Sequence, residues 1–185
     1  FKLIKILVIA LVAVLLAELF LLKVVHPSMS EPKIVFSGNS NYSTEQLMSL
    51  LAELPVNNWF TFDTEGAASR LSAVSGIDSV NIEKSFPDKI KISITERESV
   101  AMMFVNDNGR TVPIQIDKNG VLFSNTSGNV AEDGSVPIIS GIPVEHLAEG
   151  MRIPAKYRVL IEQIAKIQVL PQKYFAAISE ICVVP

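Results

Sequence analysis

Cysteine and histidine are scarce in this chain of 185 residues. It contains a single cysteine, Cys182, and two histidines, His26 and His146. One cysteine excludes an internal disulfide and a cysteine-ligated metal cluster. Charge of one sign does not accumulate either, because 16 basic residues stand against 19 acidic ones, for a net charge of -3. Without a basic stripe, nucleic-acid binding has little support.

Catalytic motifs are also missing. The sequence has no phosphate-binding loop, no dinucleotide fingerprint, no His-Glu-x-x-His and no Gly-x-Ser-x-Gly. Glu96 and Glu98 form a carboxylate pair, which a solvated strand end explains best. The stretch Asp117–Gly120 begins like a calcium loop but lacks the closing glutamate, so we interpret it as a turn. We therefore expect no enzymatic activity, no cofactor and no metal site.

One long hydrophobic run is present, Ile6–Leu22, and it is apolar apart from Glu18. A helix needs about 20 apolar residues to cross a bilayer core of about 30 Å. The segment Leu3–Val25 meets that length if Lys5 and Lys23 extend toward the two interfaces. The sequence therefore predicts an N-terminal tail and transmembrane helix over residues 1–26.

The run has the features of an anchor. It is longer than the apolar core of a signal peptide, and no Ala-x-Ala cleavage site follows it. Lys2 and Lys5 precede it and only Lys23 follows, which favours a cytoplasmic N-terminus and an extracytoplasmic bulk. Two interpretations of Glu18 stay open. It either reaches interfacial water near the outer end of the helix or makes a polar contact with another membrane helix.

Turn and helix signals organise the next segment. His26–Pro32 has two prolines and no periodicity, so we predict a linker over residues 27–32. A strand at Lys33–Phe36 is followed by a capping box at Ser43 that begins a helix ended by Pro55. Asp63 begins a second helix. We expect the aromatic residues between the two helices to pack in the core, and they are Trp59, Phe60 and Phe62.

A hairpin with one buried face closes this first domain, predicted over residues 33–97. Apolar residues alternate with polar ones on both sides of the turn at Pro87-Asp88. The order strand-helix-helix-strand-strand predicts two helices on one face of a three-stranded sheet. Such a sheet keeps an exposed edge that can accept a partner strand. The predicted edge residues are Ser79, Val80, Asn81, Ile82, Glu83 and Lys84.

The second domain, predicted over residues 98–185, contains mainly strands. Val100–Val105 and Thr111–Ile116 flank an Asn108-Gly109 hairpin turn. Further short strands follow, and then one long helix that begins near Pro154. A last strand opens at the residues predicted to form a second partner-binding edge, which are Ile178, Ser179, Glu180 and Ile181. The fold class is therefore α+β, with a mostly antiparallel second domain.

This pattern resembles a known family. A single N-terminal span followed by strand-helix-helix-hairpin is similar to the POTRA domain of FtsQ/DivIB-type bacterial cell-division proteins. The resemblance is carried by the segments Val35–Asn39, Asn58–Phe60, Ile77–Ile82, Phe86-Pro87 and Glu96-Arg97. Ser99 stands where the family usually has a proline. The family's second domain continues with further strands, so we expect this sequence to be truncated at its C-terminus.

The resemblance implies a non-enzymatic scaffold of the bacterial division machinery. Such a protein is single-pass in the cytoplasmic (inner) membrane at the septum, and it helps regulate septal wall synthesis. The implied partners are other single-pass division proteins of the FtsB/DivIC and FtsL type. Two alternatives stay open: a POTRA-containing component of an outer-membrane assembly or secretion system, and a membrane-anchored hydrolase whose active site lies elsewhere.

Overall fold

A computed structural model describes residues 2–55, 58–107, 110–124, 136–142, 150–170 and 178–184. These residues form two compact units. The first comprises Phe1–Gly38, Thr44–Leu71 and Val80–Ile94, and the second Asn39–Ser43, Ser72–Ser79 and Thr95–Pro185. The predicted Asn108-Gly109 turn and His146 lie outside the described residues.

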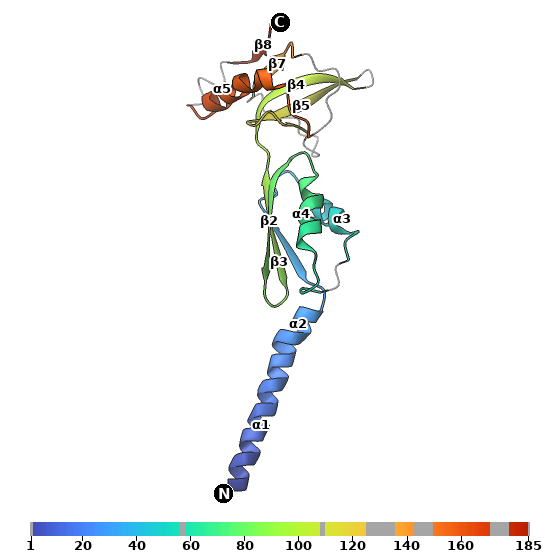
Figure 1. Cartoon of the computed structure of the whole chain (residues 1–185), viewed down its shortest axis with the longest axis vertical. Helices are drawn as coiled ribbons and strands as arrows, with labels where there is room; N and C mark the ends of the chain where they lie inside the picture. The colour runs from blue at the N-terminus through green and yellow to red at the C-terminus, as the bar shows by residue number, and fades with distance from the viewer. Residues whose placement is uncertain are drawn as a thin grey trace. The chain divides into compact units, whose positions relative to one another are not determined.

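The predicted span forms a helix, which extends further than expected (Figure 1). It consists of α1 (Lys2–Phe20), the π-helical turn η1 (Leu21–Val25) and α2 (His26–Met29). Together these make 28 residues, Lys2–Met29, long and apolar enough to cross a membrane. The expectation of a linker beginning at residue 27 was wrong, because the helix continues through Pro27.

The π-helical turn explains how the helix includes a proline. A proline inside a helix lacks an N–H and disturbs the turn before it, and a π turn at that place loosens the backbone. The amide of His26 donates to the carbonyl of Leu21, the wider i−5 spacing. One turn further, the Ser28 hydroxyl donates to the Val24 carbonyl at 2.6 Å. The backbone groups near Pro27 are thus bonded locally.

The three-stranded sheet has the order β1-β3-β2. Its strands are β1 (Lys33–Ser37), β2 (Ile77–Ser85) and β3 (Lys89–Glu96), and its helices are α3 (Thr44–Leu51) and α4 (Thr64–Ser72). The helices lie on one side of the sheet (Figure 1). Strand β3 alternates between exposed and buried residues because only one face is covered. The fully or nearly buried residues of this layer are Leu47, Leu51, Ala67, Leu71, Ile90 and Ile92.

Helix α4 begins as its sequence predicts. The Asp63 carboxylate accepts a hydrogen bond from the Gly66 amide at 2.9 Å, the geometry of an N-cap. Helix α3 ends at Leu51, earlier than Pro55 suggested. The amide of Leu54 donates to the carbonyl of Leu51, so the chain leaves the helix through a tighter turn.

The second sheet has the order β6-β5-β4-β7-β8. Its strands are β4 (Ser99–Asp107), β5 (Arg110–Asp117), β6 (Leu122–Phe123), β7 (Ile138–Ser140) and β8 (Glu180–Cys182). The long β4–β5 ladder and the β5–β6 pair are antiparallel. Strand β7 is parallel to both β4 and β8, and the chain between β7 and β8 includes η2 (Ala155–Tyr157) and α5 (Arg158–Gln168). The α+β class is thus confirmed.

Helix α5 packs on this sheet with an apolar face. Ile161 and Ile164 are buried in one cluster with residues of the strands, among them Ala101, Ile116 and Ile139. The helix was predicted from its 3.6-residue spacing of apolar side chains. Pro154 precedes it and bonds through its carbonyl to the amide of Tyr157. The cluster makes a separate core for the second unit.

Candidate interaction surfaces

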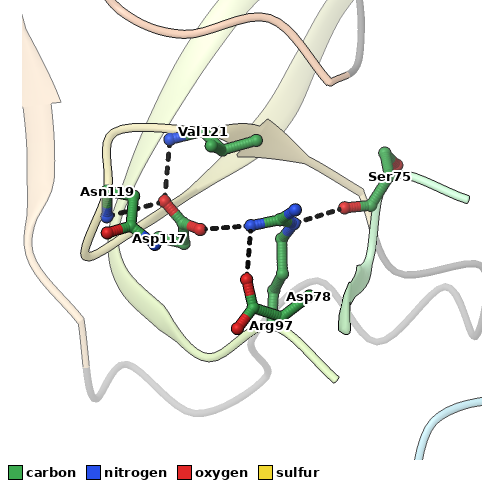
Figure 2. A network of polar contacts seen from close by, with 6 residues as sticks. All are labelled: Ser75, Asp78, Arg97, Asp117, Asn119 and Val121. Carbon is green, nitrogen blue, oxygen red and sulfur yellow. Dashed lines mark hydrogen bonds and ion pairs between the residues drawn. The ribbon is translucent and has the colours of Figure 1, made fainter. Parts of the chain in front are cut away.

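In the second unit, Arg97 forms a network of polar contacts with Asp117, Asp78 and Ser75 (Figure 2). One terminal nitrogen of Arg97 contacts Asp117 at 2.6 Å and Asp78 at 3.0 Å, and Nε donates to the Ser75 carbonyl at 2.9 Å. The Arg97 side chain is 16% exposed and that of Asp117 only 4%. A buried carboxylate is stable only when it is paired and hydrogen-bonded. Arg97 therefore fixes the chain before β2 to the end of β5.

The second oxygen of Asp117 organises the turn after β5. It accepts hydrogen bonds from the amides of Asn119 at 2.8 Å and Val121 at 2.7 Å (Figure 2). The turn interpretation of Asp117–Gly120 is thus confirmed. The Glu96-Arg97 pair is part of the family resemblance. Nothing in the sequence pattern, however, indicates that Arg97 bonds Asp117, which lies 20 residues further along the chain.

Glu96 does more than end a solvated strand. Its carboxylate accepts hydrogen bonds from the Asn41 amide at 2.9 Å and the Asn41 side chain at 2.7 Å. It also accepts one from the Tyr42 amide at 3.4 Å. The carboxylate therefore caps the connection that leads from β1 to α3. Glu96 is the last residue of β3 and its contacts to Asn41 are exposed, as expected for a solvated strand end. Periodicity did not reveal that its carboxylate also accepts hydrogen bonds from backbone amides far along the chain.

The predicted partner-binding residues of the first domain lie on an edge strand. β2 is one of the two outer strands of its sheet, and among the described residues its strand neighbour is β3 alone. Along it, Ser79, Asn81 and Glu83 are exposed, while Val80, Ile82 and Lys84 are half-buried. An edge strand of this kind leaves backbone donors and acceptors unpaired on its outer side. The structure thus brings these six residues together as one surface.

The predicted residues of the second domain lie at the far end of the second sheet. Glu180 and Ile181 are in β8, the edge strand, while Ile178 and Ser179 precede it. The Ile138 amide donates to Ser179, and the Val183 amide donates to Ser140. The odd-numbered residues of this segment, such as Ser179 and Val183, therefore direct their backbone groups toward β7. Because the backbone alternates along a strand, Glu180 and Cys182 present their amides to the outer side.

Glu18 lies in α1 and is exposed. At about 1.5 Å rise per residue, it stands roughly 22 Å along the helix from Leu3. A bilayer core of about 30 Å starting at Leu3 would place it roughly 8 Å from the outer boundary. This position is compatible with both interpretations of Glu18.

An aromatic cluster is the feature that the sequence did not predict. The Trp59 ring meets Phe60 and Phe86 edge-on, with ring centroids 5.1 Å and 5.6 Å apart. Phe60 is 61% exposed and Phe86 is 54% exposed, whereas Phe62 is buried. The expectation that Trp59, Phe60 and Phe62 all pack in the core was therefore wrong for Phe60. The turn-forming Asn58 beside them was the available signal of a surface position.

The described residues hold no group of three or more histidine, cysteine, aspartate or glutamate side chains placed to bind a metal ion. His26 is exposed at the start of α2. Of the edge strands β1, β2, β6 and β8, the predicted partner-binding residues lie on β2 and on or beside β8. In the part of the chain that the structure describes, the arginine network and the aromatic cluster stand out beside them.

Comparison with known sequences identifies the first domain. Residues 32–97 match the family described as POTRA domain, FtsQ-type. The chain is 30% identical over 115 residues to the cell division protein FtsQ of Mycolicibacterium smegmatis, which covers 62% of this chain and 33% of that protein. It is 29% identical over 119 residues to FtsQ of Anaeromyxobacter, covering 64% of this chain and 38% of that protein. Over 105 residues it is 29% identical to the cell division protein DivIB of Staphylococcus aureus, which covers 57% of this chain and 23% of that protein.

The chain therefore carries a POTRA domain, two helices on a three-stranded sheet, after an apolar N-terminal helix. Both FtsQ and DivIB sequences align with it well beyond that domain. These matches show an FtsQ-type POTRA domain at residues 32–97 and a similarity to FtsQ and DivIB over more than half of the chain. It spans less than half the length of these relatives.

Proposed function

We propose that this chain is a non-enzymatic, single-pass scaffold of the bacterial division machinery. The observation that carries the proposal is the pair of open edge strands, β2 and β8, in a chain with an FtsQ-type POTRA domain. The relatives described above are named cell division proteins. This supports a division role over the alternative of an outer-membrane assembly component.

In this proposal the helix Lys2–Met29 is an uncleaved anchor with its N-terminus in the cytoplasm. The two folded units lie outside the cytoplasmic membrane at the septum. Their partners are other single-pass division proteins of the FtsB/DivIC and FtsL type, and the assembly helps regulate septal wall synthesis. Because partner and scaffold are both anchored, binding happens at a high effective concentration, and modest contacts suffice.

The proposed mode of binding is strand addition. An extended partner segment that pairs with an open edge gains backbone hydrogen bonds, and its alternate side chains select the register. The proposed contacts are β8 with its flanking residues Ile178 and Ser179, and the β2 residues 79–84. The short β8 has only β7 beside it, so its outer side is open within the described residues.

Replacing Cys182 by proline is expected to lower recovery of the partners about tenfold. The substitution removes an outward amide of β8, and proline is tolerated on edge strands where the amide bonds no neighbour. The loss of one hydrogen bond with its register is about 1.4 kcal/mol, which is about tenfold. The measurement is affinity capture of FtsB/DivIC-type and FtsL-type proteins with the full chain in membranes.

The matched control is Cys182→Ser, which keeps the amide and should recover the partners as the parent does. On β2 the pair Asn81→Pro and Ile82→Pro serves the same purpose, because consecutive residues point their amides to opposite edges. One of these two prolines removes an amide that bonds β3 and lowers the stability of the domain. The other removes an outward amide and leaves the stability unchanged, so this second variant is the one that tests partner binding. Equal recovery by all proline and serine variants would contradict strand addition, and no recovery by the parent chain would contradict the scaffold.

Glu18→Leu tests whether the span is more than an anchor. If Glu18 makes a polar contact with another membrane helix, the substitution is expected to weaken partner recovery about threefold, since such contacts contribute about 0.6 kcal/mol on average. Septal localisation of a fluorescent fusion and capture from membranes are the two measurements. The control is Leu19→Ile on the same turn. Unchanged localisation and recovery would show that Glu18 only reaches interfacial water.

A further inference from the structure

The Trp59–Phe60–Phe86 cluster is held rigidly on the first unit. The Trp59 indole donates to the Lys89 carbonyl at 3.1 Å. The Asn58 side chain accepts hydrogen bonds from the amides of Phe60 and Thr61, both at 3.0 Å. Lys84 donates to the Phe60 carbonyl at 3.1 Å and stands 5.7 Å from the Trp59 ring centre. Two of the three rings, Phe60 and Phe86, are more than half exposed. Exposed apolar rings held in place in this way are typical of a contact surface.

Two rings of the cluster, Phe60 and Phe86, line an apolar groove with the helix that would span the membrane, and Trp59 packs edge-on against both rings. The groove has a volume of about 450 Å³. Phe60 and Phe86 form one side together with Asn58 and Thr61, and the other side is formed by Phe20, Val24, Val25, Ser28 and Met29. All of these residues belong to the first unit. Its helical side is thus a direct continuation of the span.

The length of the helix gives the depth of the groove. At about 1.5 Å per residue, a span that enters the hydrocarbon at Leu3 has covered roughly 26 Å at Phe20 and roughly 32 Å at Val24. The hydrocarbon core is about 30 Å thick. Phe20 therefore lies just inside the boundary, and Val24 to Met29 lie in the headgroup layer. Phe60 and Phe86, which share the groove with them, are at that same depth.

We propose that Trp59, Phe60 and Phe86 dock into the headgroup layer of the leaflet where the span ends. Tryptophan and other aromatic rings are enriched in this layer, and the Trp59 N–H is already bonded to the Lys89 carbonyl. Lys84 adds a cation that phosphate groups attract. The membrane is the occupant because it already surrounds the helical side of the groove. The proposal deepens the proposed function and rests on its anchor, and it fixes the first unit close to the bilayer surface.

Trp59 is the only tryptophan of the chain, so its fluorescence reports on this surface alone. The full chain is reconstituted in vesicles of phosphatidylcholine and phosphatidylglycerol, and flotation on a density gradient checks the anchor. Phosphatidylcholine carrying bromine near the headgroup end of the acyl chains is expected to quench Trp59 about twofold more than bromine near the methyl end, since indoles prefer the interface.

Two variants make the result specific. The chain with Trp59→Phe and Phe104→Trp moves the probe to an exposed residue of the second unit, outside the proposed docking surface, and should be quenched less than Trp59 by bromine near the headgroup end. The chain with Phe60→Ser and Phe86→Ser keeps Trp59 and should lose at least half of the quenching. Flotation without quenching of Trp59 would overturn the docking while leaving the anchor intact. A parent chain that does not float would overturn both. Quenching equal in all variants would also overturn the docking.

Discussion

Replacing Arg97 by methionine is expected to destabilise the turn that Asp117 holds after β5. Methionine keeps much of the apolar stem but leaves the Asp117 carboxylate, 4% exposed, without a cation. Breaking a buried pair by removing one partner costs about 3 kcal/mol, because an uncompensated charge remains buried. The opening equilibrium of this turn should thus rise about 100-fold. Hydrogen exchange of the Asn119 and Val121 amides, which both donate to Asp117, measures that opening directly.

The matched control is Arg70→Met. Arg70 pairs with Glu53 at 2.7 Å, nearly the distance of the Arg97–Asp117 contact, but its side chain is 39% exposed and that of Glu53 80%. Exposed ion pairs contribute about 0–1 kcal/mol because water and salt screen them. Exchange of the amides around Arg70 should change less than tenfold. If both arginine variants show equally small changes, burial of Asp117 does not make its pair important.

A double-mutant cycle separates the pair from the packing. Asp117→Asn keeps an acceptor for the two turn amides but removes the charge. If the Arg97–Asp117 contact dominates, combining Arg97→Met with Asp117→Asn should cost less than the sum of the single changes. Purely additive costs would show that Arg97 acts through Ser75 and Asp78 instead.

The sequence predicts most of the first domain because its signals are local. The alternation of β3, the Asp63 cap and the apolar face of α3 each depend on residues within one element. The open edge of β2 follows from the strand order of the first sheet, which a strand-helix-helix-hairpin pattern restricts to few arrangements. For the same reason α5 and the β4–β5 ladder agree with their predicted positions.

The features that sequence analysis missed depend on distant or competing effects. Arg97 meets Asp117 through the tertiary fold, and no periodicity relates the two residues. Phe60 is apolar and so was expected inside, yet a small two-layer core has room for only some of its aromatic residues, here Phe62. Pro27 indicated a helix end, but the preceding π turn lets the helix continue. In each case, interactions with other residues outweighed what the local sequence alone predicts.

Gly141→Ala is expected to detach β8 from its sheet. Gly141 follows β7 with φ of +83°, and a Cβ atom there would approach the carbonyl oxygen of Val183 to 2.2 Å. A left-handed conformation alone costs an alanine about 1–2 kcal/mol. The overlap is with backbone, so the chain after β8 must move away, and β7 is the one strand that holds β8 in the described part of the chain. Exchange of the Val183 amide, which donates to Ser140 at 2.9 Å, should accelerate at least 100-fold, corresponding to about 3 kcal/mol.

Gly150→Ala separates the two causes. Gly150 has nearly the same φ, +81°, but a Cβ atom there would meet nothing within 4 Å. It should therefore show only the conformational cost of about 1–2 kcal/mol and leave the Val183 amide protected. If β8 is a partner edge, Gly141→Ala should abolish partner capture through β8, whereas Gly150→Ala should retain it. Loss of Val183 protection with undiminished capture would show that partners bind elsewhere, and the scaffold proposal would then depend on β2 alone.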